Sequence, residues 1–171
     1  MHPTQTLFLC ALTAITGSVS GQITSLGKLT FEGPLDEEED LSAVAILGDS
    51  LLVGSDEGTK VQILQPDPTN PSIYRVRPDL DINMLVSKTE LDIEGIARFK
   101  DTNVFYVAGS HSLKRTLLEP NATKEQNLAA LEQIVFEPSR FHIYRLEMDL
   151  RTLKPISKRG IGLYRLLSLN P

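Results

Sequence analysis

The feature that most constrains the fold is a pair of short apolar segments, 91–99 and 103–111, separated by the polar stretch 100–102. Both segments have the composition of β-strands, and the short polar connection predicts a β-hairpin. In an antiparallel pair the start of the first strand lies beside the end of the second. Asp92 and Glu94 lie at the start of the first strand, and Ser110 and His111 lie at the end of the second. All four are therefore expected at the same end of the hairpin.

A second hairpin of the same design is predicted earlier in the chain. The residues of segment 40–45 resemble those of 92–97, and Asp49 and Asp101 occupy corresponding places in the two turns. The spacing is close to the repeat of propeller blades, which is roughly 40 to 50 residues. Two alternatives stay open: a chance similarity between two hairpins, and a β-sandwich, which also contains many hairpins.

These patterns predict a mainly β fold of an incomplete β-propeller type. It would contain about two four-stranded antiparallel blades, one over about 40–80 and one over about 90–168, plus one short inserted helix. The predicted strands, besides a weaker one at 26–31, are 41–47, 51–55, 60–64, 73–76, 91–99, 103–111, 141–148 and 160–167.

The inserted helix is predicted over about 124–135. Thr123 and Gln126 have the spacing of a capping box. Leu128, Leu131 and Val135 would share one helical face, and Pro138 prevents the helix from continuing. We expect this insertion to act as a lid or a spacer.

The N-terminus has features of a secretory signal. Residues 7–15 are apolar and small residues follow at 17–21, so cleavage is predicted near Gly21. This divides the chain into a signal peptide (1–21) and a β-domain (22–171) that is secreted or periplasmic. The alternative is an ordinary buried segment, since 1–6 contain neither Lys nor Arg. Cleavage would remove Cys10, the single cysteine, and with it disulfides, thiolate nucleophiles and thiolate metal sites.

The charge of the chain excludes some partners. A formal net charge of −5 argues against nucleic-acid binding, which needs a basic surface, and against electrostatic docking on anionic lipid. The apolar segment 7–15 is too short for a stable membrane span. The acidic run 36–40 is typical of a solvated loop, with a cation site as the alternative reading.

In a propeller, the starts of the innermost strands and the loops between second and third strands gather on one face. Hairpin geometry would therefore bring together on that face Asp40, Asp56, Glu57, Asp92, Glu94, Ser110 and His111. Repulsion between these carboxylates would be relieved by Lys60, Arg98 or Arg140, or by a divalent cation such as calcium. Asp92, Glu94 and Asp56 are the candidate metal ligands, although all these acids could instead cap loops and meet water. The candidate ligand-binding residues are Asp56, Glu57, Asp92, Glu94, Arg98, Ser110 and His111.

Catalysis by a nucleophile pair is not favoured. Adjacent residues on a strand point to opposite faces, so Ser110 and His111 are poorly placed to act as nucleophile and base. No Gly-rich phosphate loop, G-x-S-x-G elbow or H-E-x-x-H sequence is present. Whether the protein is an enzyme therefore stays open.

Segments 92–98, 109–111 and 140–146, with 42–45 and 53–58 before them, resemble an uncharacterised domain-of-unknown-function family of mostly bacterial secreted proteins. The resemblance covers about 40–147. It implies a propeller-like fold distantly similar to phytase-like propellers that share an Asp-x-Glu-Gly strand. It also implies candidate functional residues, which are Asp56, Glu57, Asp92, Glu94, Arg98, Ser110 and His111.

Three functions are compatible with these observations. The first is a secreted propeller-like domain that binds a small molecule or a cation at the acidic end of its blades. The second is a metal-dependent phosphoester hydrolase of phytase-like type, and the third is a non-catalytic truncated fragment. A closed propeller needs at least four blades. We therefore expect either a truncated product or self-association through open sheet edges.

Overall fold

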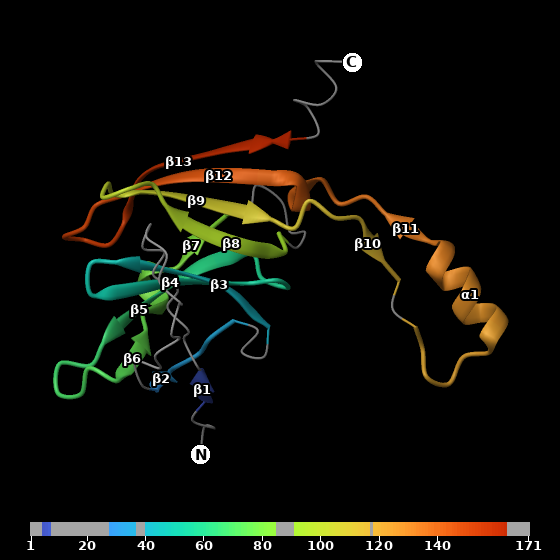
Figure 1. Cartoon of the computed structure of the whole chain (residues 1–171), viewed down its shortest axis with the longest axis horizontal. Helices are drawn as coiled ribbons and strands as arrows, with labels where there is room; N and C mark the ends of the chain where they lie inside the picture. Colours follow the sequence, from blue (N-terminus) through green and yellow to red (C-terminus); the bar gives the residue numbers. More distant parts are fainter. Residues whose placement is uncertain (1–4, 8–27, 37–39, 85–90, 117, 164–171) are drawn as a thin grey trace, which may run out of the picture.

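The computed structural model describes residues 5–7, 28–36, 40–84, 91–116 and 118–163 of the chain. The described part is mainly β, with one α-helix and two 3-10 turns (Figure 1). The elements are β1 (Gln5–Leu7), β2 (Leu29–Glu32), β3 (Leu41–Leu47), β4 (Ser50–Ser55), β5 (Lys60–Pro66), β6 (Ile73–Val76), η1 (Pro78–Leu80), β7 (Ile82–Asn83), β8 (Ile93–Arg98), β9 (Val104–Gly109), β10 (Lys114–Arg115), α1 (Lys124–Glu132), β11 (Ile134–Val135), η2 (Pro138–Phe141), β12 (His142–Met148) and β13 (Pro155–Gly162).

The strands form two main sheets and one small ribbon. The first sheet has the order β1-β2-β6-β5-β4-β3, with β7 paired to β5, and the second has the order β13-β12-β9-β8. All pairings in the two sheets are antiparallel except that of β2 with β6. The ribbon consists of β10 and β11.

Both predicted hairpins are present. Strands β3 and β4 pair around a turn at Gly48, whose positive φ of 62° suits glycine. Strands β8 and β9 pair with Ile93 opposite Gly109, which places the start of β8 beside the end of β9 as expected. The two hairpins belong to different sheets, and β3 and β8 are each the edge strand that faces the other sheet (Figure 1).

The two sheets pack on each other through a shared core. Side chains from β3–β5 meet side chains from β8, β9 and β12, among them the fully buried Ile63, Ile93, Phe105 and Leu146. Contact is close where the sheets meet, because a Cβ on Gly54 would lie 2.8 Å from Ile93 Cγ2. The hydroxyl of Ser42 also donates a hydrogen bond to the carbonyl of Ile93. The apolar side chains that the two sheets bury against each other therefore hold the two hairpins together in one core.

The outer face of the first sheet has a smaller core of its own. Phe31 of β2 packs there with Leu51, Val53, Leu64 and Val76. Strand β2 pairs in parallel with β6 at this part of the sheet. The sequence pattern did not predict this pairing.

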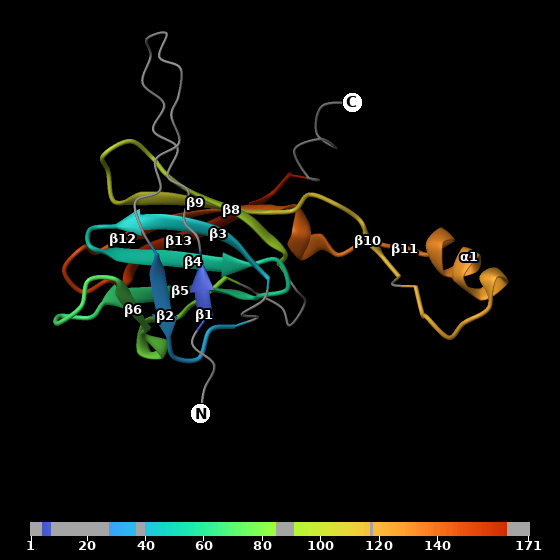
Figure 2. The same cartoon turned by 60° about the horizontal axis from the view of Figure 1, so that its bottom comes forward.

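The insertion between β9 and β12 projects from the body as an arm (Figures 1 and 2). The capping box of α1 is confirmed, since Thr123 Oγ1 accepts from the Gln126 amide and Gln126 Oε1 accepts from the Thr123 amide. The helix ends at Glu132 rather than near 135, because Ile134 and Val135 form β11 and pair with β10.

The last strand also differs from the prediction. Strand β13 covers Pro155–Gly162 and begins directly after the turn that follows β12. The apolar run at 160–167 had suggested a later strand, of which 164–167 lie outside the described residues. The tight turn decides the register, because Asp149 and Lys154 pair through their backbones and Leu153 adopts a positive φ of 56°.

The predicted signal peptide lies outside the described residues except for β1, whose three residues pair with β2. Within the described part of the chain, no helix has the length and apolar character needed to cross a membrane.

Candidate functional site

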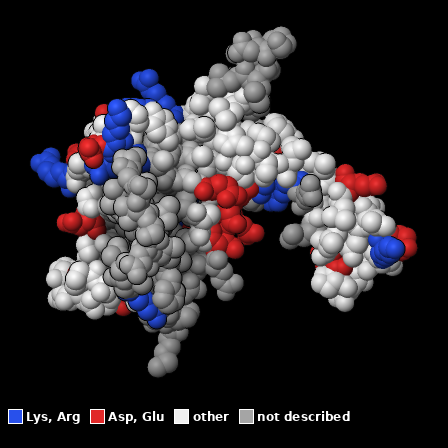
Figure 3. All heavy atoms as spheres, viewed as in Figure 1, with Lys and Arg blue, Asp and Glu red and all other residues white. Residues whose placement is uncertain are grey.

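The candidate site lies at the end of the two sheets where β3, β5 and β8 begin and β4 and β9 end. Backbone hydrogen bonds connect the loops at this end: the amide of Leu91 donates to the carbonyl of Gly58 at 3.1 Å, and the amide of Asp56 donates to that of Asp40 at 3.1 Å. Figure 3 shows acidic side chains gathered over this end of the sheets, with basic side chains beside them. We call it the acidic end.

At its centre is a buried ion pair. Asp92 is 6% exposed and Arg140 is 9% exposed, and Arg140 Nη1 lies 2.8 Å from Asp92 Oδ2. Asp92 comes just before β8 with a left-handed φ of 54°, a conformation that Asp tolerates better than most residues. Buried charges need a partner of opposite sign, so each of these side chains fixes the other.

Arg140 comes from the 3-10 turn η2, which leads into β12. Its Nε lies 3.2 Å from Glu137 Oε2, and its Nη1 lies 3.3 Å from Ser112 Oγ. The Arg140 carbonyl accepts a hydrogen bond from the His111 amide at 3.0 Å. Arg140 therefore connects the loop after β9, the loop before β8 and the turn before β12.

The close approach of these loops depends on Gly109. A Cβ at this position would lie 2.4 Å from the Arg140 carbonyl oxygen and 2.9 Å from that of Leu91. Both are backbone atoms that cannot rotate away, so glycine is required where β9 ends.

His111 and Ser110 follow Gly109 at the acidic end, as predicted. His111 has a left-handed φ of 54°, and its ring packs edge-on against Phe141 with the ring centres 6.3 Å apart. Its buried Nε2 has no hydrogen-bond partner among the described residues. Ser110 Oγ accepts instead from the Ser112 hydroxyl at 2.9 Å. A nucleophile–base contact between Ser110 and His111 is not among the hydrogen bonds of the described residues.

The first sheet contributes Ser55 and Asp56 from the end of β4. Ser55 is 3% exposed, and neither its Oγ nor the buried Asp56 Oδ1 has a hydrogen-bond partner among the described residues. The tight loop at Gly58 closes over Ser55, since a Cβ on Gly58 would lie 2.4 Å from Ser55 Oγ. Glu57 in the same loop is exposed.

Lys60 forms a second ionic cluster at this end. Its Nζ lies 2.9 Å from Asp81 Oδ2 and 3.5 Å from Asp36 Oδ1. Burial lowers the pKa of Lys60, but the hydrogen bond and charge of Asp81, with those of Asp36, raise it above its ordinary value overall. Asp81 Oδ1 is buried and, in the described part of the chain, lacks a hydrogen-bond partner.

Two predicted site residues are less involved. Glu94 is exposed on β8 near the acidic end. Arg98 lies at the other end of β8, where its Nε donates to the Thr102 carbonyl at 2.6 Å, so the structure does not bring it to the acidic end. From the sequence, Arg140 was expected only as one possible counter-charge, and Glu137 was not predicted to take part in the site. The spacing of Glu137 and Arg140 across Pro138 was the available signal.

The structure also bears on the predicted cation ligands Asp56, Asp92 and Glu94. Across 28–36, 40–84, 91–116 and 118–163, no group of three or more His, Cys, Asp or Glu side chains is placed to hold a metal ion. Asp92 already has a cationic partner in Arg140. A cation at this end would therefore need ligands beyond the protein, such as water or a bound molecule.

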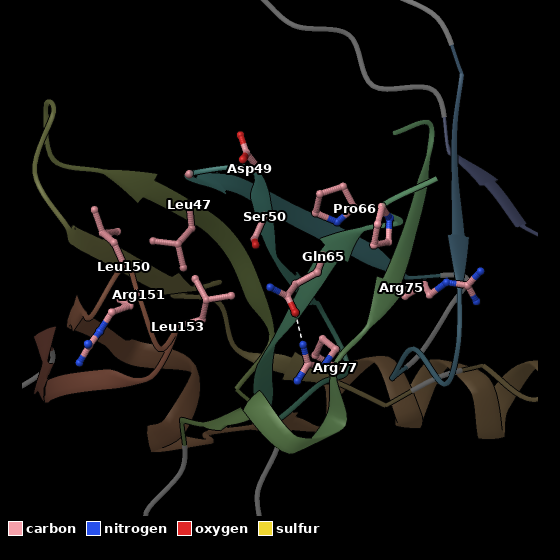
Figure 4. A pocket seen from close by; sticks show the side chains of 12 residues that line it. Leu47, Asp49, Ser50, Gln65, Pro66, Arg75, Arg77, Leu150, Arg151 and Leu153 are labelled. Atoms are coloured by element: carbon pink, nitrogen blue, oxygen red, sulfur yellow. Dashed lines mark hydrogen bonds between the residues drawn. The ribbon is translucent and has the colours of Figure 1, made fainter. Parts of the chain in front are cut away.

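A pocket of about 600 Å³ lies at the opposite end of the sheets (Figure 4). Its arginines are mostly neutralised: Arg75 pairs with Glu32 and Asp67, and Arg77 pairs with Asp79 and contacts Gln65. None of the predicted site residues lines it. It is lined by Leu47, Gly48, Asp49, Ser50, Gln65, Pro66, Pro68, Arg75, Arg77, Leu150, Arg151 and Leu153.

Comparison with known proteins gives one match. Residues 40–159, more than half of the chain, match the family described as "Protein of unknown function (DUF3616)". No curated protein and no solved structure matches the chain.

Proposed function

This chain belongs to the family of proteins of unknown function DUF3616, and we propose that it is a secreted, propeller-related β-domain that binds a small polar ligand or a divalent cation at its acidic end. The matched region, 40–159, contains every side chain on which the binding part of this proposal depends. The family description itself assigns no activity.

The order of the strands supports a relation to propellers. Strands β3, β4, β5 and β6 are neighbours in chain order in the first sheet, and β8, β9, β12 and β13 are neighbours in chain order in the second. Each group resembles a four-stranded blade, and their first strands lie side by side. The resemblance of segment 92–98 to phytase-like propellers points the same way.

The observation that carries the binding proposal is a set of buried polar atoms at one end of both sheets. Apart from Arg140 Nε and Glu137 Oε2, which lie 3.2 Å from each other, four such atoms have no hydrogen-bond partner among the described residues. Buried polar groups are normally hydrogen-bonded, and leaving one unpaired costs about 1–3 kcal/mol. A bound polar molecule would offset this cost. The four atoms are Ser55 Oγ, Asp56 Oδ1, Asp81 Oδ1 and His111 Nε2.

The chemistry of these atoms indicates the class of ligand. The two carboxylate oxygens only accept hydrogen bonds when ionised, and the serine hydroxyl and the histidine nitrogen can also accept. A ligand rich in N–H or O–H donors, or a hydrated cation, fits such a set. An anionic ligand does not fit, because Arg140 is already paired with Asp92 and Glu137.

Thermal-shift and calorimetric titrations test the proposal, using calcium chloride and a panel of polyols and amines. We expect at least one of these to raise the melting temperature of the wild type but not that of Asp56→Asn. Asp101→Asn, in the exposed turn between β8 and β9, is the matched control and should respond like the wild type. The proposal fails if the wild type responds to nothing in the panel, or if Asp56→Asn responds fully.

Asp56 Oδ1 also favours a second candidate, metal-dependent phosphoester hydrolysis of phytase-like type. A buried carboxylate oxygen without a donor is a natural ligand for a hard cation, which could activate a water molecule. Activity on a phosphoester panel should then require calcium and be lost in Asp56→Ala. Activity that survives this substitution rules out the carboxylate mechanism. Absence of both binding and turnover would favour the third possibility, a non-catalytic fragment.

Secretion is tested separately. If the signal is cleaved near Gly21, mass spectrometry of the protein recovered from the periplasm or medium should show an N-terminus at about Gln22. Recovery with residues 1–21 intact would contradict this part of the proposal.

A further inference from the structure

The pocket opposite the acidic end, which we call the far pocket, is lined by both sheets (Figure 4). The first sheet contributes the turn between β3 and β4, the end of β5, and β6 with the residue after it. The second sheet contributes the turn between β12 and β13. The volume of about 600 Å³ lies in the range of roughly 300–1,000 Å³ that is usual for small-molecule sites.

One part of its wall is apolar. Leu47 and Leu153 belong to the core that the two sheets share, so the far pocket begins where this core ends. Leu150 lines the pocket beside them and is 50% exposed, and Pro66 and Pro68 complete the apolar lining. A molecule with an apolar body would gain free energy by covering these side chains.

The polar part of the wall begins with a buried hydroxyl group. Ser50 is 4% exposed, and in the described part of the chain its Oγ forms no hydrogen bond. In Figure 4 this oxygen points toward Gln65. Buried hydroxyl groups normally have a hydrogen-bond partner. The Ser50 hydroxyl is therefore available to a molecule in the far pocket.

Gln65 lies directly opposite Ser50. The register that pairs Leu51 with Leu64 places these two residues side by side on neighbouring strands, on the face that meets the second sheet. Gln65 Oε1 accepts a hydrogen bond from Arg77 Nη1. A guanidinium group only donates, so this contact fixes the orientation of the Gln65 amide. Its Nε2 then lies on the side of the pocket and has no hydrogen bond with any described residue.

The charges around the far pocket do not favour a charged ligand. Arg75 and Arg77 are paired with carboxylates. Asp49 and Arg151 are exposed, have opposite charges and lie on turns of different sheets, and Lys154 nearby is also exposed. In Figure 4 the Arg151 guanidinium points away from the polar wall. The groups that face a bound molecule are therefore uncharged donors.

We propose that the far pocket is a second binding site, for a small uncharged molecule with an apolar body and a carbonyl oxygen, such as a ketone, an ester or a lactone. The oxygen would accept a hydrogen bond from Gln65 Nε2, with the Ser50 hydroxyl as a second donor. The apolar body would lie on Leu47, Leu150 and Leu153. Such a ligand differs from the donor-rich molecule or cation proposed for the acidic end, so the two sites are independent.

NMR titration of the labelled protein with cyclohexanone and with ε-caprolactone tests the proposal. We expect both probes at millimolar concentration to shift the amide signals of Gly48 and Leu153 and the side-chain amide of Gln65. Signals of Gly58 and Gly109 at the acidic end should not move. Cyclohexylamine, which has the same apolar body but is a charged donor at neutral pH, should not shift the pocket signals.

Variants separate binding from folding. Ser50→Ala removes a hydroxyl without a partner, so its melting temperature should equal or slightly exceed that of the wild type. Its affinity for cyclohexanone, and that of Gln65→Leu, should fall about fivefold, as expected for one lost hydrogen bond. Ser157→Ala on β13, outside the pocket, is the matched control, and Asp56→Asn at the acidic end should also bind cyclohexanone like the wild type.

Other results would overturn the proposal. A wild type whose pocket signals respond to neither probe removes the site. Unchanged affinity in both Ser50→Ala and Gln65→Leu would show that these donors do not bind the oxygen. Tighter binding of cyclohexanecarboxylate than of cyclohexanone would contradict an uncharged ligand, and loss of cyclohexanone binding in Asp56→Asn would contradict the independence of the two ends.

Discussion

Arg140 and Asp92, which are far apart in the sequence, form an ion pair of 2.8 Å, with both residues at most 9% exposed. The pair joins the turn before β12 to the residue that opens β8. It also holds the backbone of Arg140 where its carbonyl accepts from the His111 amide. The acidic end therefore depends on one buried arginine for its shape.

Loss of Arg140 should be costly. In Arg140→Met, Asp92 stays buried without its counter-charge, and we expect unfolding free energy to fall by about 3–5 kcal/mol, the usual cost of breaking a buried pair. Asp92→Asn should cost less, since Asn keeps the left-handed backbone and Arg140 keeps Glu137. Urea denaturation measures both variants.

A double variant and a control at the surface test whether this loss of stability comes from the buried ion pair. Arg140→Met with Asp92→Asn should cost less than the sum of the single variants, because no unpaired aspartate remains. Arg145→Met breaks the more exposed pair with Glu147, in which the side chains are 39% and 35% exposed, and should cost at most about 1 kcal/mol. Strict additivity in the double variant would show that the buried pair is not coupled.

Gly109→Ala should destabilise the protein by about 1–3 kcal/mol or more, as expected for overpacking. Its added methyl group would lie 2.4 Å from the Arg140 carbonyl oxygen. Gly95→Ala is the matched control on the neighbouring strand, since a Cβ there meets nothing within 4 Å. Thermal unfolding should show a lower melting temperature for the first variant and an unchanged or slightly higher one for the second. Equal effects would contradict the close approach of these loops.

Asp67 should make stability depend on pH. Hydrogen bonds from the Thr69 hydroxyl and from Arg75 hold the pKa of Asp67 well below its ordinary value. A depressed pKa stabilises the fold above the unfolded-state value of about 3.9, and this stabilisation is lost as pH falls through the folded-state pKa.

We therefore expect Asp67→Asn to lower the melting temperature at pH 7, and the gap to the wild type to narrow as the pH falls below about 4. Asp101→Asn serves as the control in melting curves measured across this range. If the difference in melting temperature between Asp67→Asn and the wild type does not change with pH, the charge of Asp67 does not stabilise the fold.

Thr123→Ala should affect α1 and little else. Removing the N-cap hydroxyl costs a helix about 1 kcal/mol, but no residue of α1 is buried in the chain. Hydrogen exchange should show faster exchange of the α1 amides. The global melting temperature should be unchanged, and a marked fall would mean that α1 contributes to the core.

Much of the fold could be predicted from the sequence because the signals are local. Alternating apolar residues and short polar turns predicted the hairpins β3–β4 and β8–β9, and the Thr123–Gln126 spacing predicted the helix cap. The same hairpin geometry predicted that Asp92 and His111 share one end, since strand pairing alone fixes that relation. The extent of β13 was missed because a left-handed turn, rather than apolar character, decides its register.

What the sequence by itself determined is therefore the class of fold and the position of the acids along the strands. Only the tertiary structure decided that Asp92 faces Arg140, that Arg98 lies at the far end of β8, and that the arm leaves the body without burying a helical side chain. The physical reason is range. Strand pairing and helix capping depend on neighbouring residues, whereas a buried charge finds its partner only when the packing of two sheets brings distant loops together.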